Sequence, residues 1–135
     1  MTVHYRQVTG AADFDPAFDV LARERVEALI AFPDALVMSR AAAIAEFARR
    51  QRVGAVSGWA EFVEAGNLMS YGPSLRVTWR QAAIVVDRLL RGAKPADLPV
   101  EQPLRYELVL NMKTARELGL QVPQRLLLAA ERLIE

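Results

Sequence analysis

Residues 53–73, which read VGAVSGWAEFVEAGNLMSYGP, decide the fold. They contain two short apolar segments, Val53–Gly58 and Leu68–Tyr71, and we predict a strand for each. The residues between them, Ala60–Ala65, suffice for a helical turn or two. Gly72-Pro73 ends the second strand, because proline has no amide hydrogen to continue a ladder. This order of strand, helix and strand is typical of a parallel sheet with right-handed crossovers.

The alternation continues on both sides of this stretch. Val3–Val8 alternates apolar and polar residues, which predicts a strand covered on one face. Ala28–Phe32 is a continuous apolar run stopped by Pro33-Asp34, as expected of a core strand covered on both faces. Tyr106–Asn111 predicts a fifth strand. The sequence therefore predicts an α/β fold with a mostly parallel sheet of about five strands and helices on both faces.

Helices are predicted where apolar residues recur at helical spacing next to capping residues. They run from Asp13 or Asp15 to Arg25, from Ser39 to Gln51, from Ser74 to Gly92, from Thr114 to Leu118 and from Gln124 to Leu133. Trp79 falls on the apolar stripe of the third of these, so we expect it to pack in the core. The proline-rich residues 93–103 predict an extended connection over the surface.

Composition excludes several classes of function. The 135 residues include no cysteine, so disulfides, thiolate metal sites and a cysteine nucleophile are absent. The formal net charge is +1, and we expect neither nucleic acid nor an anionic membrane as a partner. Apolar stretches stay shorter than the roughly 20 residues of a membrane span, which predicts no membrane insertion. The N-terminal residues 1–7 lack the pattern of an export signal.

No catalytic constellation is found in the sequence. His4 is the only histidine, and we interpret it as a surface residue. The glycine-rich phosphate loops, the nucleophile elbow and the spacings of zinc ligands are all missing, so no cofactor and no metal are predicted. Glu61 and Glu64 are interpreted as a solvated helix surface. The basic cluster Arg49, Arg50 and Arg52 is interpreted as a solvated helix end.

The loops that follow the strands form the candidate ligand site. Ligands of parallel sheets bind beyond the carboxyl ends of the strands, here at residues 33–36, 58–61 and 71–74. Trp59 and Tyr71 are placed either to stack on a flat or apolar solute or to cover the core. Asp34 is placed either to accept a hydrogen bond from an ammonium group or to cap a turn.

Three motifs resemble a known family. Residues 61–73 (EFVEAGNLMSYGP), 92–103 (GAKPADLPVEQP) and 108–115 (LVLNMKTA) are similar to the C-terminal half of ABC transporter substrate-binding proteins. The related proteins are the binding components for tryptophan and tyrosine uptake, with a periplasmic binding protein-like type I fold. Because the resemblance also includes Ala28–Asp34 and Pro123–Glu135, it spans nearly the whole chain.

The resemblance implies a protein of two Rossmann-like lobes that close by a hinge on a small solute, without catalysis. Residues 1–135 would then be a single domain, equivalent to the second three-layer lobe. Implied partners are a small organic solute, amino-acid-like or aromatic, the missing N-terminal lobe and an ABC permease. The positions that match the second-lobe cleft of the family are Pro33, Asp34, Ala35, Gly58, Trp59, Tyr71 and Gly72.

Two features limit what the resemblance implies. Ala35 stands where amino-acid-binding relatives carry a polar residue, usually Asn. The family is periplasmic, whereas a chain without an export signal leaves the cytoplasm open as a location. An alternative function is a stand-alone dimerisation or interaction module, whose partner is a second copy of the chain. A small enzyme on the same scaffold would lack a nucleophile, a base and a residue to orient them.

Overall fold

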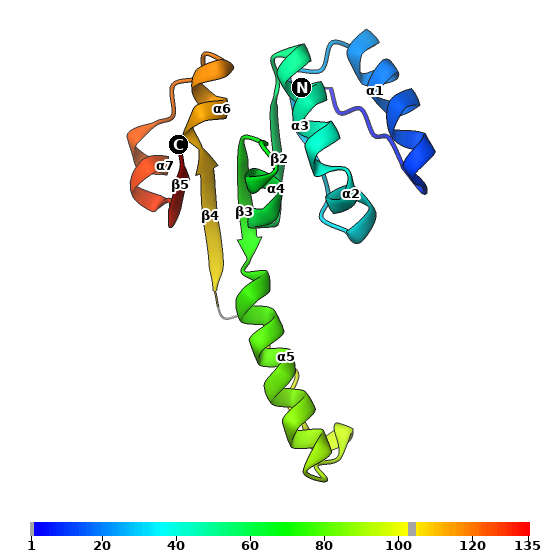
Figure 1. Ribbon diagram of the computed structural model, residues 1–135, viewed down its shortest axis with the longest axis vertical. Helices are drawn as coiled ribbons and strands as arrows, with labels where there is room; N and C mark the ends of the chain where they lie inside the picture. Colours follow the sequence, from blue (N-terminus) through cyan, green and yellow to red (C-terminus); the bar gives the residue numbers. More distant parts are fainter. Residues whose placement is uncertain (1, 103–104) are drawn as a thin grey trace.

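The computed structural model describes residues 2–102 and 105–135. Its five-stranded sheet has the order β1-β2-β3-β4-β5 (Figure 1). The strands are β1 Ala28–Ile30, β2 Gly54–Ser57, β3 Met69–Pro73, β4 Tyr106–Asn111 and β5 Arg132–Ile134. β1, β2 and β3 are parallel, β4 runs antiparallel to β3, and β5 is parallel to β4. The predicted α/β class with a mostly parallel sheet is confirmed.

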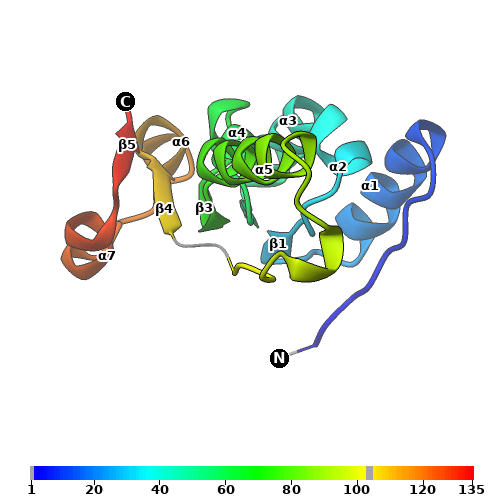
Figure 2. The same cartoon turned by 90° about the horizontal axis from the view of Figure 1, so that it is seen from below.

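Helices connect the strands. They are α1 Phe14–Arg23, α2 Ala35–Ser39, α3 Ala41–Gln51, α4 Ala60–Glu64, α5 Leu75–Leu90, α6 Met112–Glu117 and α7 Gln124–Ala129. The chain also forms two short 3-10 helices, η1 Ala11–Asp13 and η2 Pro95–Asp97. Figure 2 shows α3, α4 and α6 on one side of the sheet and α7 on the other.

The core lies between the sheet and the helices α3 and α4. Phe62, Val63 and Val109 have no exposed surface, and burial of each such side chain contributes about 1.5–3 kcal/mol. Asn67 is the polar link within this core. Its side-chain amide donates hydrogen bonds of 2.9 Å to the carbonyls of Ala41 and Phe62, which ties the start of α3 to α4. This packing fixes the β2, α4, β3 unit that the sequence predicted.

The prediction of two strands in the N-terminal third was partly wrong. Residues 3–8 are extended but form no strand, because no neighbouring strand pairs with them. β1 is an edge strand rather than a core strand covered on both faces, and its Ile30 is 69% exposed. A continuous apolar run therefore did not distinguish a strand buried on both faces from one that is still open to solvent.

Other boundaries also differ from the predictions. Ser39 ends α2 instead of capping α3, and its hydroxyl donates to the carbonyl of Leu36 at 2.6 Å. The final predicted helix stops at Ala129, after which the chain forms β5. The proline-rich connection contains η2, and its last predicted residue, Pro103, lies outside the described residues. Trp79 is 70% exposed, which makes the expectation of core packing wrong.

Candidate functional site

Three of the candidate loops meet at the carboxyl edge of β1, β2 and β3. Gly58 packs so closely on Pro33 that a Cβ at position 58 would lie 2.9 Å from Cγ of the proline. A Cβ at Gly72 would lie 2.0 Å from the carbonyl oxygen of Gly58. Both glycines thus allow a close approach of backbone that any side chain would prevent. The structure brings Pro33, Gly58 and Gly72 together, although they are far apart in sequence.

Asp34 lies exposed beside this contact and caps a helix. Its Oδ1 accepts a hydrogen bond of 2.8 Å from the backbone amide of Val37, so the residue is the N-cap of α2. Of the two roles predicted for Asp34, a cap and a ligand for an ammonium group, the fold therefore shows the cap. Ala35 is the first residue of α2 and is exposed. Its methyl group offers a solute neither a donor nor an acceptor.

The two aromatic candidates occupy different environments. Trp59 is half-buried at the N-cap of α4, where its backbone carbonyl accepts from the amide of Phe62 at 3.1 Å. Tyr71 is 62% exposed and contacts the ring of Tyr106, at a centroid distance of 5.9 Å and a tilt of 33°. Tyr106, the first residue of β4, was missed by the sequence argument. Its strand register opposite Pro73 brings it to this edge.

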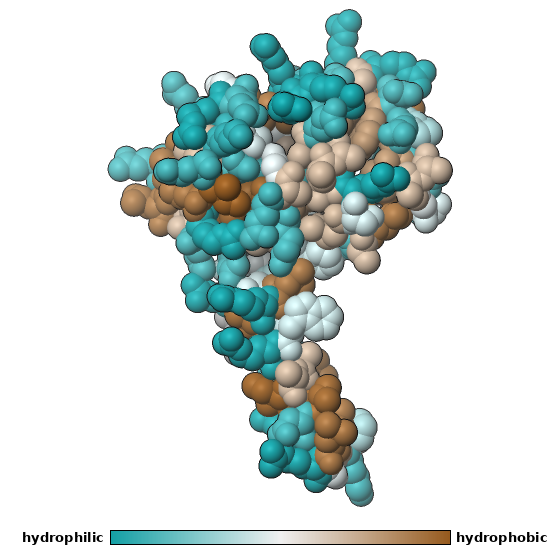
Figure 3. Space-filling view, viewed as in Figure 1, coloured by the Kyte–Doolittle hydropathy of each residue, from teal (hydrophilic) through white to brown (hydrophobic). Residues whose placement is uncertain are grey.

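Helix α5 projects from the same edge of the sheet. Figure 1 shows it leaving the end of β3 and extending away from the other helices, and the chain returns along it through η2. We call residues 75–102 the arm. None of the residues of α5 is buried. Trp79, Ala82, Val86 and Leu90 recur at intervals of three and four residues, so they form one exposed apolar stripe. Apolar residues gather along the arm in Figure 3.

Two buried hydroxyls beneath the site are a further feature that the sequence did not indicate. Ser57 and Ser70 are opposite each other in the register of β2 and β3, next to the loops of Gly58 and Gly72. Both are at least 95% buried, and their hydroxyl oxygens have no hydrogen-bond partner among the described residues. No alternation pattern distinguishes such serines from ordinary strand residues, because only the packing of α3 and α4 buries them.

The acidic and basic clusters lie on the surface, as interpreted. Glu64 forms an ion pair with Arg132 of β5, and Glu61 is exposed. Arg49, Arg50 and Arg52 are exposed at the end of α3. Within residues 2–102 and 105–135, no group of three His, Asp or Glu side chains could hold a metal ion. No helix in this part of the chain has the length and apolar character of a membrane span.

The sequence of the chain matches one protein family over its length. The profile of the family described as "ABC transporter substrate binding protein" matches residues 1–134. The chain belongs to this family. Its members are binding proteins rather than enzymes, which agrees with the absence of a catalytic motif in the sequence. A comparison with curated proteins gave no match.

Solved structures with the same fold support the assignment. An ABC domain from Streptococcus pneumoniae in complex with L-Trp has a TM-score of 0.91 and 25% identity, covering 99% of this chain and 45% of that structure. A conserved domain protein from Vibrio cholerae has a TM-score of 0.86 and 25% identity, covering 95% and 43%.

A third structure is similar in fold alone. It is the ligand-free, open form of a substrate-binding protein with adhesive properties from Clostridium difficile, with a TM-score of 0.66 and 17% identity. The match covers 96% of this chain and 43% of that structure. The chain thus spans less than half the length of each of the three structures.

Proposed function

We propose that the chain is the second lobe of a two-lobe solute-binding protein of an ABC-type uptake system. The loops of Pro33, Gly58 and Gly72 would form one wall of the solute cleft. The observation that carries this proposal is the arm, because α5 leaves the sheet at the same edge as these loops and buries none of its side chains. A helix with an exposed apolar stripe needs a second surface to cover it, and a first lobe facing the cleft would supply that surface.

The residues at this edge favour a small organic solute with an aromatic or amino-acid character. Tyr71 and Tyr106 offer exposed ring faces, and the carboxylate of Asp34 can accept from an ammonium group with the oxygen that the cap leaves free. The L-Trp complex of the pneumococcal relative supports this solute class. Ala35 would contribute only apolar contact.

Membership in the family supports the remaining partners that we propose. Hinge closure of two lobes around the solute would present a closed protein to a membrane permease, on the extracytoplasmic side of the membrane. The arm would lie across the junction of the lobes, since it is attached to the site edge at β3 and at β4. We therefore propose a periplasmic location, the first lobe as the covalent or separate partner, and the permease as the receiver of the solute.

A thermal-shift panel of amino acids and small aromatic acids tests the solute site. A solute at about 100 times its Kd adds about 2.7 kcal/mol to the free energy of unfolding, which would raise the Tm by about 10 °C in a chain of this size. The variant Tyr71→Ala should lose the shift, and Leu128→Ala, an exposed residue of α7, should keep it. The absence of a shift with every solute would contradict a working site on this lobe.

The exposed stripe of α5 also favours a second candidate, a dimerisation module. Two copies could cover each other's stripes in an isologous contact. Sedimentation equilibrium would then show a dimer that Trp79→Asp converts to a monomer. A monomer at all concentrations would contradict this candidate and leave the stripe for the first lobe.

A further inference from the structure

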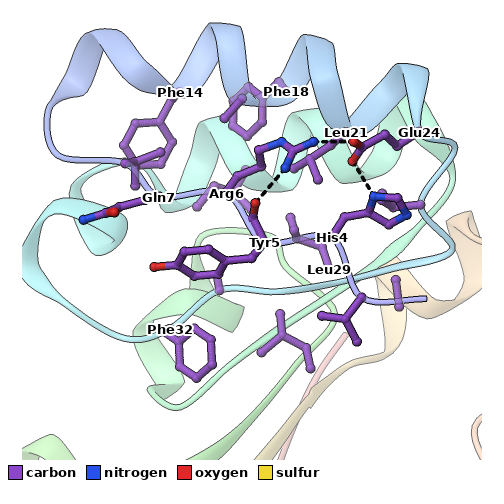
Figure 4. Close-up of a pocket in the computed structure, with 18 of the residues that line it drawn as sticks. His4, Tyr5, Arg6, Gln7, Phe14, Phe18, Leu21, Glu24, Leu29 and Phe32 are labelled. Atoms are coloured by element: carbon purple, nitrogen blue, oxygen red, sulfur yellow. Dashed lines mark hydrogen bonds and ion pairs between the residues drawn. The ribbon is translucent and has the colours of Figure 1, made fainter. Parts of the chain in front are cut away.

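A trench separates the N-terminal segment from the sheet. Its cavity volume is about 760 Å³, and it is lined without interruption by residues 2–8 on one side and by residues 24–32 on the other. Figure 4 shows the residues that line it below α1, with Tyr5 above Phe32 in this view. Residues 2–8 and 28–32 contain no helix and run along the trench, while residues 24–27 are the turn and bend that lead from α1 into β1. The trench is therefore a gap between two strand-like segments, along the flank of the sheet.

The wall formed by β1 has an unpaired backbone edge. The amide of Ala31 donates to the carbonyl of Val56 at 2.9 Å, so Ala31 faces β2. Alternate residues of a strand direct their backbone N–H and C=O groups to opposite edges. Because Ala31 faces β2, the backbone groups of Ile30 and Phe32 face the trench. Within the described residues, no backbone hydrogen bond joins residues 2–8 to β1. Such an edge is a template for another strand.

Apolar side chains lie on both faces of the sheet next to the position that another strand would occupy. Leu29, Ala31 and Val8 pack against the core on the helix side. Ile30 and Phe32 are exposed on the opposite face, with Phe32 at 72%. A strand inserted here would have apolar neighbours on both faces, which is the environment of a central strand in an α/β sheet. This pattern predicts an occupant that is rich in branched aliphatic residues.

Polar contacts attach the N-terminal segment near the two ends of α1. Glu24, just after α1, pairs with Arg6 and lies 2.9 Å from Nδ1 of His4. The carboxylate of Asp13 accepts from the amides of Thr9 at 2.7 Å and Gly10 at 2.9 Å. These hydrogen bonds lower the pKa of Asp13. The segment is thus attached to α1, and the trench stays open.

We propose that the trench accepts one apolar β-strand of the polypeptide that completes the two-lobe protein, inserted between residues 2–8 and β1. The occupant follows from the walls, because only an extended peptide can satisfy a backbone edge along a whole strand. More than half the length of the matched structures lies outside this chain, which leaves ample polypeptide to supply it. That the strand comes from the polypeptide of the other lobe rests on the proposed function. That the trench accepts a strand does not depend on it.

The test adds a strand to the chain itself. The N-terminus is extended with the peptide Thr-Val-Ile-Val-Val, joined by about 12 Gly and Ser residues, which reach about 20 Å. The control extension carries proline at the second and fourth strand positions, where it cannot donate to a ladder. The strand should raise the Tm by several degrees and slow amide exchange at Ile30 and Phe32 at least tenfold. Ala31 should be unchanged, and the proline control should show neither effect.

Two point variants sharpen the result. Ile30→Lys should reduce the gain in Tm, because a charge would lie beside the inserted strand. Leu128→Lys, a change at an 80% exposed residue of α7, should leave the gain intact. Equal rates of amide exchange at Ile30 and Phe32 with the strand and the proline extension would overturn the proposal. Slow exchange of these amides in the unextended chain would also overturn it, because residues 2–8 would then pair with β1 themselves. A solute from the panel whose binding is lost in Ile30→Lys would instead make the trench a solute pocket. The Tm and the amide exchange are measured without a solute, so failure of this test is distinguishable from failure of the solute test of the cleft.

Discussion

Asp34 combines a structural role that is shown with a binding role that is proposed. Its Oδ1 caps α2 through the amide of Val37, while the second oxygen is unused in the described hydrogen bonds. Capping requires an acceptor oxygen but no charge, whereas an ammonium group of a solute prefers a full negative charge. The two roles can therefore be separated by the choice of substitution at this one position.

Substitution of Asp34 should separate stability from binding. Asp34→Ala should lower the free energy of unfolding by about 1 kcal/mol because the cap is lost, and Asp34→Asn should retain most of this stability. Both variants should weaken the binding of an amino-acid solute. Urea denaturation and titration calorimetry measure the two effects. Unchanged affinity in Asp34→Asn would show that the carboxylate does not contact the solute.

Gly72 is the residue that the packing of the site tolerates least. A Cβ at this position would lie 2.0 Å from a backbone carbonyl oxygen, which cannot move as a side chain can. Gly72→Ala should therefore destabilise the fold by about 3 kcal/mol through overpacking. Gly10→Ala is the matched control, since nothing lies within 4 Å of its added Cβ. Comparable urea midpoints for the two variants would contradict the close contact of the Gly58 and Gly72 loops.

At the scale of elements, α5 is the part of the chain where pattern and environment disagree. Its apolar spacing is that of a helix packed on a core, yet none of its residues is buried. The spacing correctly predicted a helix with one apolar face. It did not indicate what covers that face, because an amphipathic stripe is the same whether it faces the rest of its own domain or another one.

Truncation of Trp79 should therefore cost little in this chain. Trp79→Ser should change the free energy of unfolding by less than about 0.5 kcal/mol, as for other exposed positions. Phe62→Ala is the comparison, and loss of this fully buried ring should cost about 3–5 kcal/mol. A large loss in Trp79→Ser would mean that α5 packs within the domain or within a dimer. Sedimentation of the wild-type chain distinguishes these two cases.

At the scale of the whole molecule, the arm makes the chain longer than a compact domain. A compact chain of this length has a radius of gyration of about 14 Å. With α5 extending away from the sheet, as in Figure 1, small-angle scattering of the monomer should give a clearly larger value. A value near 14 Å would show that the arm folds back on the sheet in solution. Deletion of residues 75–102 is less informative, because these residues connect β3 to β4.

The shape also relates the proposed site to the proposed strand trench. The site loops lie at the carboxyl edge of the sheet, and the trench runs along the flank at β1. By the two proposals, the first lobe supplies the opposite wall of the site and a strand of the same polypeptide pairs with β1. A partner polypeptide that fills the trench would thus bring its remaining residues close to the edge that carries the cleft.

The sequence by itself determined the fold class and the β2, α4, β3 unit. Local periodicity and turn residues encode these, and the position of ligand loops at the carboxyl edge of parallel strands predicts Pro33, Gly58 and Gly72 as site residues. Tertiary structure alone decided three other features. It showed residues 3–8 as extended but unpaired, β5 in place of the end of a helix, and Trp79 in solvent. The physical reason is that pairing and burial depend on which surface is adjacent, and a residue pattern specifies a face without specifying its neighbour.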